Sequence, residues 1–272
     1  MSAGAVATRW HEYRRGWKDI DAGVIEEASL TIYVNGVELV TIMSTPREQD
    51  LLALGFLKNE GFIDNLKEVD HIHISKEGRC VDIWLTHSIV QPKRKIITTG
   101  CGGGVTFKES LTGFKAFQDD LRIAPEVLFE IFRQLHNPDS LHARTRGVHA
   151  AGITDGKRLL AITEDVGRHN TIDKLVGASM VKGIDTRGLI LLATGRISSE
   201  MLHKGARMGC PIIASRNSPT SISIAMADAW NITLIGYVRR GSMRVYAHPE
   251  RLGYRQPTAL PIAGNLLKAA GL

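Results

Sequence analysis

The sequence predicts an α/β fold in which a layered core follows a smaller α+β lobe that is built on β-hairpins. Three observations support this prediction. Short apolar runs alternate with helical patterns from Gly147 onward, which is typical of helices that cover a central sheet. Two pairs of alternating runs in the first half indicate hairpins. The chain has 272 residues, of which 43% are hydrophobic, so it can bury one substantial core and a smaller lobe.

The first half contains the signals for two hairpins and a helix. Asn35-Gly36 separates the β-rich runs 30–34 and 37–43, and both turn residues tolerate a positive φ. Apolar and polar residues alternate in runs 71–74 and 81–84, which predicts the second hairpin. Between them, Thr45-Pro46-Arg47-Glu48 predicts the start of a buried helix, with Thr45 as its N-cap, that ends at Gly61. We expect this lobe over residues 29–122, after a polar tail over residues 1–28.

The second half is predicted to form the core over residues 123–254, followed by a C-terminal tail over residues 255–272. Apolar residues at helical spacing predict a helix over residues 125–135. The predicted strands then cover residues 148–153, 159–162, 189–193, 212–214, 232–236 and 244–247, and the predicted helices lie near residues 172–181, 200–208 and 219–230.

One stretch of the first half has the features of a reactive site. Cys101 lies in Thr99-Gly100-Cys101-Gly102-Gly103-Gly104, directly after an apolar run. Because glycine lacks a Cβ, such a loop turns sharply and lets a large partner approach the sulfur. Lys93, Arg94 and Lys95 supply nearby positive charge, which favours the thiolate, the nucleophilic form of cysteine. We therefore predict that Cys101 does chemistry.

Composition excludes several classes of protein. The 34 basic and 28 acidic residues suit an anionic ligand or an acidic partner. Their scattered distribution and the 6% aromatic content disfavour nucleic-acid binding. Three cysteines, Cys80, Cys101 and Cys210, are too few for a disulfide framework and favour a reducing compartment. No apolar run is long enough to span a bilayer, and no signal peptide is evident, so we expect a cytoplasmic protein without a membrane partner.

Three predicted strand-to-helix junctions each carry an arginine beside helix-capping residues. Free N–H groups and the helix dipole favour negative charge at such places, and open α/β sheets bind ligands at the carboxyl ends of their strands. A single junction would be explained by ordinary capping, whereas three favour an extended, multiply charged ligand such as a nucleotide diphosphate. The junctions are Glu164-Asp165-Val166-Gly167-Arg168-His169, Thr194-Gly195-Arg196-Ile197-Ser198-Ser199 and Ser215-Arg216-Asn217-Ser218-Pro219.

Histidines offer two further interpretations. His149 and His169 are candidates for a base that activates Cys101 in a cysteine hydrolase or transferase, and each is also explained as a hydrogen-bonded structural residue. His71 and His73 would share one face of a strand. Such a pair can bind a metal, but because no third ligand stands nearby, a solvated strand face is the better explanation. We therefore predict no metal site.

A series of motifs matches those of a known family, and the block Glu164-Asp165-Val166-Gly167-Arg168-His169 is the most specific of them. The chain resembles the formate dehydrogenase accessory sulfurtransferases, the FdhD family, over roughly residues 24–252. The other matching motifs are Val34-Asn35-Gly36, Leu54-Gly55-Phe56, Glu60-Gly61, Thr99-Gly100-Cys101-Gly102, His149-Ala150-Ala151, Asp173-Lys174-Leu175, Val245-Tyr246 and His248-Pro249.

The resemblance implies a cytidine deaminase-like core, a homodimer and a sulfurtransferase activity. It implies that Cys101 accepts sulfur from a cysteine desulfurase as a persulfide, and that the sulfur passes to bis-molybdopterin guanine dinucleotide, with molybdenum or tungsten, for formate dehydrogenase. In this implied role the cofactor is a bound substrate. The family's cofactor-binding segment matches Tyr237, Val238, Arg239, Arg240, Gly241 and Ser242, and the junctions add Arg168, His169, Arg196 and Arg216 to the expected binding residues.

This sequence departs from the family pattern at one position. Many members carry a second cysteine three positions after the first, where this chain has Gly104. Cys101 is therefore expected both to receive and to deliver the sulfur. Two alternatives stay open: a cofactor-binding chaperone in which the thiol is incidental, and a Cys-His hydrolase. Zinc-deaminase chemistry is disfavoured because the Pro-Cys-x-x-Cys ligands are absent.

Overall fold

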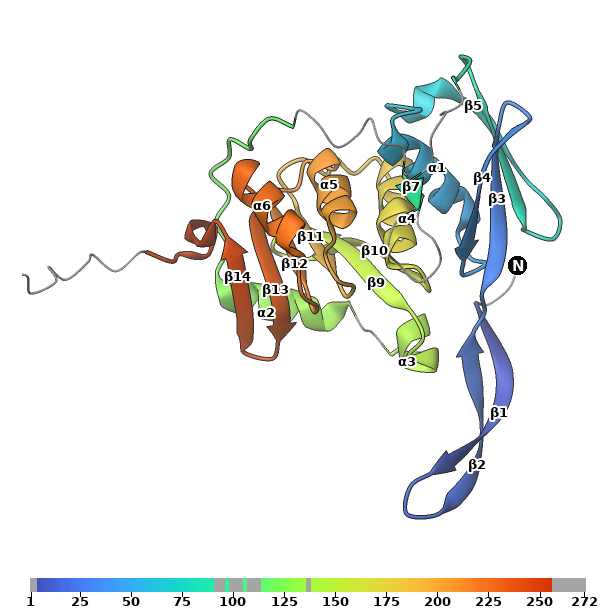
Figure 1. Ribbon diagram of the computed structural model, residues 1–272, viewed down its shortest axis with the longest axis horizontal. Helices are drawn as coiled ribbons and strands as arrows, with labels where there is room; N and C mark the ends of the chain where they lie inside the picture. The colour runs from blue at the N-terminus through green and yellow to red at the C-terminus, as the bar shows by residue number, and fades with distance from the viewer. Residues whose placement is uncertain (1–3, 91–95, 98–104, 107–113, 136–137, 256–272) are drawn as a thin grey trace, which may run out of the picture.

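The region from residue 147 onward forms a six-stranded mixed sheet in a computed structural model, which describes residues 4–90, 96–97, 105–106, 114–135 and 138–255 (Figure 1). The strand order is β10-β9-β11-β12-β13-β14. The three central strands β11, β12 and β13 run parallel, and the other neighbouring pairs are antiparallel. The strands are β9 (His149–Thr154), β10 (Leu159–Asp165), β11 (Ile190–Ala193), β12 (Ile212–Ser215), β13 (Thr233–Arg239) and β14 (Ser242–Ala247).

Helices cover both faces of this sheet. Successive side chains of a strand point to opposite faces. Leu191 and Ala193 pack in the core formed with α4 (Arg168–Val181), α5 (Ser199–Arg207) and α6 (Ser221–Ala229). Ile190 and Leu192 pack in a separate core formed with α2 (Pro125–Gln134) on the other face. This layering confirms the predicted α/β class, and the cytidine deaminase likeness stays a prediction.

The N-terminal lobe is a second sheet with the order β4-β3-β6-β5, packed against α1 (Gln49–Glu60). Both predicted hairpins are confirmed, and the first turns at Asn35 and Gly36, whose φ values are 52° and 77°. The strands are β3 (Ala28–Val34), β4 (Val37–Ser44), β5 (Val69–Ile74) and β6 (Cys80–Leu85), and the remaining short elements are η1 (Leu66–Glu68), β7 (Ile96–Ile97), β8 (Val105–Thr106), α3 (Leu141–Thr145) and η3 (Pro249–Leu252).

A close helix crossing joins the lobe to the core. Helix α1 lies against α4, and Gly55 and Gly177 face the partner backbone at the crossing. A Cβ on Gly55 would clash with the Asp173 carbonyl oxygen, and one on Gly177 would clash with the Leu51 carbonyl oxygen. Glycine is required here because only it lets the two backbones approach so closely.

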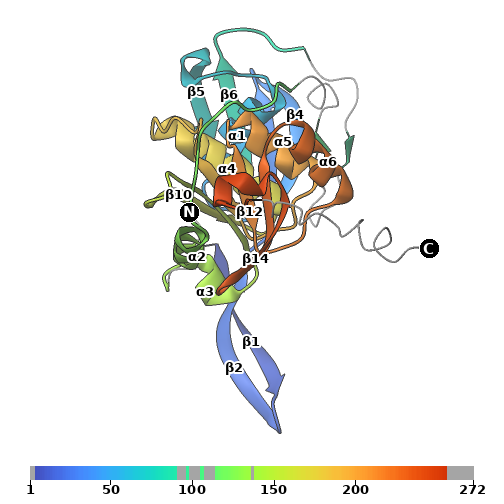
Figure 2. The ribbon, with the colours of Figure 1, turned by 90° about the vertical axis from the view of Figure 1, so that its left-hand side faces the viewer.

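Two expectations for the first half are wrong. Helix α1 begins at Gln49 after Glu48, which has a φ of 55°, and Thr45 is not its N-cap. The residues expected as a polar tail form a hairpin of β1 (Ala5–Tyr13) and β2 (Trp17–Ile25) that stands away from the body (Figure 2). The boundaries between lobe and core stay predictions, and the expected C-terminal tail beyond Arg255 lies outside the described residues. No helix within the described ranges is long and apolar enough to cross a membrane.

Candidate functional site

The three predicted junctions meet at one edge of the main sheet. Strands β11, β12 and β13 are parallel, so their carboxyl ends lie together. Asp165, at the end of β10, pairs with His149, at the start of β9, and Ala193 pairs with Ala151 of β9, which places both at this edge. The Arg216 backbone N–H donates to the Ala193 carbonyl oxygen at 3.1 Å and ties the second junction to the third. We call this region the arginine edge: Arg168, Arg196, Arg216, Arg239 and Arg240 with the backbone that carries them.

The first junction is held by a buried ion pair. Lys174 Nζ lies 2.6 Å from Asp165 Oδ2, and both side chains are fully buried. Asp165 also accepts hydrogen bonds from the Gly167 backbone N–H and from Asn170 Nδ2, each at 2.8 Å. The Thr45 backbone N–H donates to Asp165 at 3.1 Å. Asp165 therefore ties the lobe to the start of α4, where Arg168 is the first helical residue.

Glu164 and Asp165 do not act as a pair. The Glu164 carboxylate accepts from the backbone N–H groups of Leu141 and His142, at 2.7 and 3.0 Å, and so binds the N-terminus of α3. Adjacent residues of a strand point to opposite faces. A joint acid and base role for these two carboxylates is therefore excluded by their separate hydrogen bonds.

A second buried pair braces the helices behind the edge. Lys204 Nζ lies 2.7 Å from both carboxylate oxygens of Asp173, and Asn59 Nδ2 donates to Asp173 at 2.7 Å. Burial opposes the charged lysine, but the carboxylates of Asp173, Glu200 and Glu60 outweigh it and raise the pKa of Lys204. Asp173 and Lys174 are thus both buried, and neither is on an exposed face of α4.

His169 is a neutral group beside the arginines. It is 5% exposed, with Nε2 3.4 Å from Ser198 Oγ and Nδ1 3.6 Å from Glu200 Oε2. Burial, followed by the charges of Lys204 and Arg168, lowers the pKa of His169 to about 3. Burial and Arg168 also lower the pKa of His149, whose Nδ1 lies 3.4 Å from Thr194 Oγ1. Such histidines are poor bases at neutral pH, which weakens the hydrolase alternative.

The second and third junctions approach the first closely. A Cβ on Gly195 would lie 2.8 Å from Arg168 Cβ, so only glycine lets the backbone pass beside this side chain. Asn217 Nδ2 donates to the Thr194 carbonyl oxygen at 2.8 Å and braces the two loops against each other. Ser198 caps α5 by accepting from the Met201 backbone N–H at 3.4 Å. These roles of Asn217 and Ser198 were not predicted, although the position of both residues between a strand and a helix indicated capping or loop bracing.

The segment from Tyr237 to Ser242 turns from β13 into β14 at the same edge. Arg239 Nη1 donates to the Arg216 carbonyl oxygen. Burial, with a smaller contribution from the Arg239 charge, lowers the pKa of Arg216. Arg244 stacks over the Tyr237 ring at 4.3 Å. Arg239, Arg240, Gly241 and Ser242 are exposed, whereas Val238 is 2% exposed and packs in the core with α2, so it is not open to a ligand.

Cys101 lies outside the described residues, so its position relative to the arginine edge stays a prediction. Ile97 of β7 pairs with Val105 of β8, which means that the stretch holding Cys101 starts and ends on neighbouring strands. Of the other cysteines, Cys80 is half-buried in β6, and burial raises the pKa of the Cys210 thiol. Within the described ranges, no group of three histidine, cysteine, aspartate or glutamate side chains is arranged to hold a metal ion.

Comparison with known proteins defines the class of this chain. The model of the FdhD/NarQ family matches residues 25–253, and the chain belongs to this family. The recognised resemblance is therefore confirmed, and the matched region includes the whole arginine edge. The hairpin of β1 and β2 precedes the matched region almost entirely.

Individual relatives share most of their length with it. The chain is 34% identical to a sulfur carrier protein FdhD of Bacillus subtilis over 254 residues, which is 91% of this chain and 97% of the relative. It is also 34% identical to the protein of the same name from Bacillus pumilus, over 89% of this chain and 95% of that one. A crystal structure described as a formate dehydrogenase accessory protein from Desulfotalea psychrophila superposes with a TM-score of 0.76 at 28% identity, over 91% of this chain and 99% of the other.

Proposed function

We propose that this protein is a sulfur carrier that serves a formate dehydrogenase, with Cys101 as the residue that holds the sulfur. The names of its relatives support sulfur transfer and an accessory role. The observation that carries the proposal is the arginine edge, which gathers five arginines and the starts of α4 and α5 in a chain of this family. This arrangement suits a carrier that must hold an anionic acceptor.

The loading step transfers one neutral sulfur atom. The Cys101 thiolate attacks the outer sulfur of a persulfide on a cysteine desulfurase, a new S–S bond forms on Cys101, and the desulfurase leaves as its thiolate. Delivery then requires a thiol reductant, which attacks the inner sulfur of the Cys101 persulfide, forms a mixed disulfide and releases hydrosulfide. Because Gly104 stands where many relatives have a second cysteine, this thiol comes from another molecule.

The proposed acceptor is bis-molybdopterin guanine dinucleotide, with molybdenum or tungsten, bound as a substrate. Its two pyrophosphates are anions, and the residues at the arginine edge fit them. The arginines supply positive charge, and the starts of α4 and α5 supply backbone N–H groups. A homodimer in the cytoplasm completes the proposal.

Sulfur loading tests the proposal directly. The protein is incubated with a cysteine desulfurase and cysteine, and its intact mass is measured. The wild type and Cys80→Ser should gain the mass of one sulfur atom, whereas Cys101→Ser should gain none. Equal loading of Cys101→Ser would contradict the role of Cys101.

The arginine edge also supports a second candidate, a chaperone that binds the cofactor without persulfide chemistry. Restoration of formate dehydrogenase activity in cells that lack the protein separates the two. A sulfur carrier requires Cys101, so Cys101→Ala should fail to restore activity. A chaperone requires the arginine edge alone, so Cys101→Ala should succeed while Arg168→Gln and Arg240→Gln fail.

A further inference from the structure

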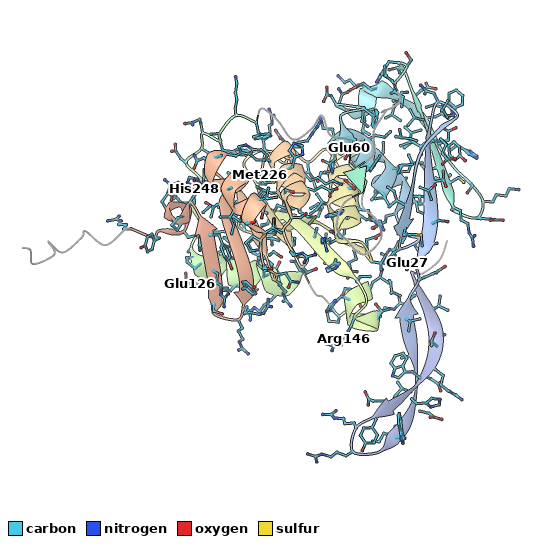
Figure 3. All side chains as sticks on the ribbon, viewed as in Figure 1. Glu27, Glu60, Glu126, Arg146, Met226 and His248 are labelled. Atoms are coloured by element: carbon cyan, nitrogen blue, oxygen red, sulfur yellow. The ribbon has the colours of Figure 1, made fainter. Side chains whose placement is uncertain are left out.

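A cavity lies where the lobe meets the core, at the opposite end of the helices from the arginine edge. Helices α4 and α5 start at that edge, and the cavity is lined by their last turns and by the last turn of α1. Figure 3 labels Glu60, the last residue of α1, on this side of the core. At about 1.5 Å per residue, the 14 residues of α4 place the cavity about 20 Å from the arginine edge. The cavity is therefore separate from the proposed sulfur-transfer site.

This cavity has an apolar floor and a charged rim. Its volume of about 440 Å³ lies within the range of pockets that hold small molecules. The floor consists of the buried Val176 and Met208 and the half-buried Met180 and Ile184. Lysine, arginine and aspartate side chains surround this floor. The floor therefore suits an apolar group, and the polar groups of a ligand would meet the surrounding charges.

Two of the cations at the rim already have carboxylate partners. Lys58 Nζ lies 3.2 Å from Asp64 Oδ1, and Arg187 Nη2 lies 2.6 Å from Asp185 Oδ2. Arg207 differs from them. Among the described residues its guanidinium has one hydrogen bond, from Nη2 to the Lys58 carbonyl oxygen at 3.3 Å, and no carboxylate partner. Its remaining N–H groups are open to an anion, and a planar guanidinium can bind a carboxylate through two parallel hydrogen bonds.

Asn59 offers a second polar group to the cavity. This residue is 3% exposed and lines the cavity from the last turn of α1. Its Nδ2 donates to Asp173 at 2.7 Å, which fixes the orientation of the amide. Within the described part of the chain, no group donates to its Oδ1. Because Asp173 holds the nitrogen, the oxygen is the atom that Asn59 presents to a ligand, and an amide oxygen requires a hydrogen-bond donor.

We propose that this cavity binds an α-amino acid with an apolar side chain. The carboxylate of the amino acid binds Arg207, and its ammonium group donates to Asn59 Oδ1. The apolar side chain packs on Val176, Met180 and Met208. The last turns of α1, α4 and α5 bring the negative ends of three helix dipoles to the cavity, which favours a ligand that carries an ammonium group beside its carboxylate over a simple anion.

Isothermal titration calorimetry of the full chain with L-leucine tests the proposal. Two analogues of L-leucine each lack one charged group: isocaproate has no ammonium group, and isoamylamine has no carboxylate. L-leucine should bind about tenfold or more tightly than either analogue, because each analogue loses a charge-assisted hydrogen bond. Absence of saturable L-leucine binding, or equal binding of all three compounds, would overturn the proposal.

Two matched arginine variants locate the carboxylate of the bound ligand. Arg207→Gln should weaken L-leucine binding about tenfold or more, because it removes the cation that has no carboxylate partner among the described residues. Arg187→Gln should leave the Kd unchanged, because Asp185 already occupies the Arg187 guanidinium. Equal losses in the two variants would indicate general charge attraction and would contradict the assigned role of Arg207.

A measurement on the wild type covers the case in which Arg207→Gln disturbs the fold. The NMR signals of the Met180 and Met208 methyl groups should shift as L-leucine saturates the protein, because both side chains line the cavity. The signals of Met43 in β4 and Met243 in β14 should stay in place. Binding of L-leucine without shifts at Met180 and Met208 would place the site elsewhere and overturn the proposal. Sulfur loading of Cys101 is measured independently, so the proposed function does not depend on this outcome.

Discussion

Asp165 is the residue on which the first junction depends, because its two oxygens bind the lobe, the start of α4 and Lys174. Asp165→Asn should lower the free energy of unfolding by about 3–5 kcal/mol, since it leaves the buried Lys174 charge without its counter-ion. Urea unfolding measures this change. Asp185→Asn, which removes an exposed ion pair with Arg187, is the control and should have no measurable effect. Equal stability of Asp165→Asn and wild type would contradict the assigned pair.

The lowered pKa of His169 predicts that the free energy of unfolding depends on pH. Its pKa of about 3 in the folded protein lies below the ordinary value of 6.5, so between these two pH values the unfolded chain binds a proton that the folded chain does not. Stability should therefore fall as pH decreases through this window, by about 1.4 kcal/mol per pH unit from this residue. His169→Asn should remove that part of the slope in urea unfolding from pH 6 to pH 4. An NMR titration of His169 with a midpoint near 6.5 would contradict it.

At the level of single residues, the charged residues of the site were easier to predict from the sequence than the residues with which they pair. Arg168, Arg196 and Arg216 were identified from their position between a strand and a helix, a local property. Asp165 and Lys174 pair with each other, and their charged types alone do not show it; the further partners of Asp165 and Asp173 lie on distant elements, at Thr45, Lys204 and Asn59. The local sequence did not indicate that the polar residues of α4 are buried. They are buried because the sheet and α1 together cover this helix.

Among the elements, the crossing of α1 and α4 is the most constrained. Gly177→Ala should cost about 3 kcal/mol or more, because a Cβ meets the Leu51 backbone and neither helix can shift without opening the core. Gly183→Ala is the control. It has a φ of 65° and open space around it, so it should cost only about 1 kcal/mol from backbone conformation. Thermal and urea unfolding of both variants measure the difference, and similar losses would show that packing at the crossing is not tight.

Elements with strong local signals were predicted correctly, and the missed ones depend on distant contacts. Asn35-Gly36 and Gly61 determine a turn and a helix end by their own backbone preferences. Thr45 has the composition of an N-cap, but its side chain instead accepts from the Val166 backbone N–H, at 3.1 Å across the lobe interface. The β1–β2 hairpin was not predicted, because it has few apolar residues and its many charged residues are typical of a polar tail.

For the molecule as a whole, the sequence predicted the α/β class but not how the two halves are joined. Local periodicity indicates alternating strands and helices, and this alternation predicts a layered core. The lobe is joined to this core by Asp165, by the α1–α4 crossing and by Asn59. The residues in these contacts are far apart in the sequence, so hydrophobic periodicity could not predict them. The three junctions meet at one edge because β10, β11 and β12 all end there: β11 and β12 are parallel, and β9 lies antiparallel between β10 and β11.

The arginine edge should bind a guanine nucleotide through its phosphates as one continuous surface. GDP is the probe, with affinity measured by isothermal titration calorimetry. Arg196→Gln and Arg216→Gln should each weaken binding about tenfold, because each removes a charge-assisted contact, and raising the salt concentration should weaken binding further. Arg158→Gln is the matched control, since Arg158 is exposed at the opposite end of β10 from Asp165. Equal losses in Arg158→Gln and Arg196→Gln would indicate general charge attraction, and binding that depends on Arg196 and Arg216 alone would place the phosphates at the starts of α5 and α6.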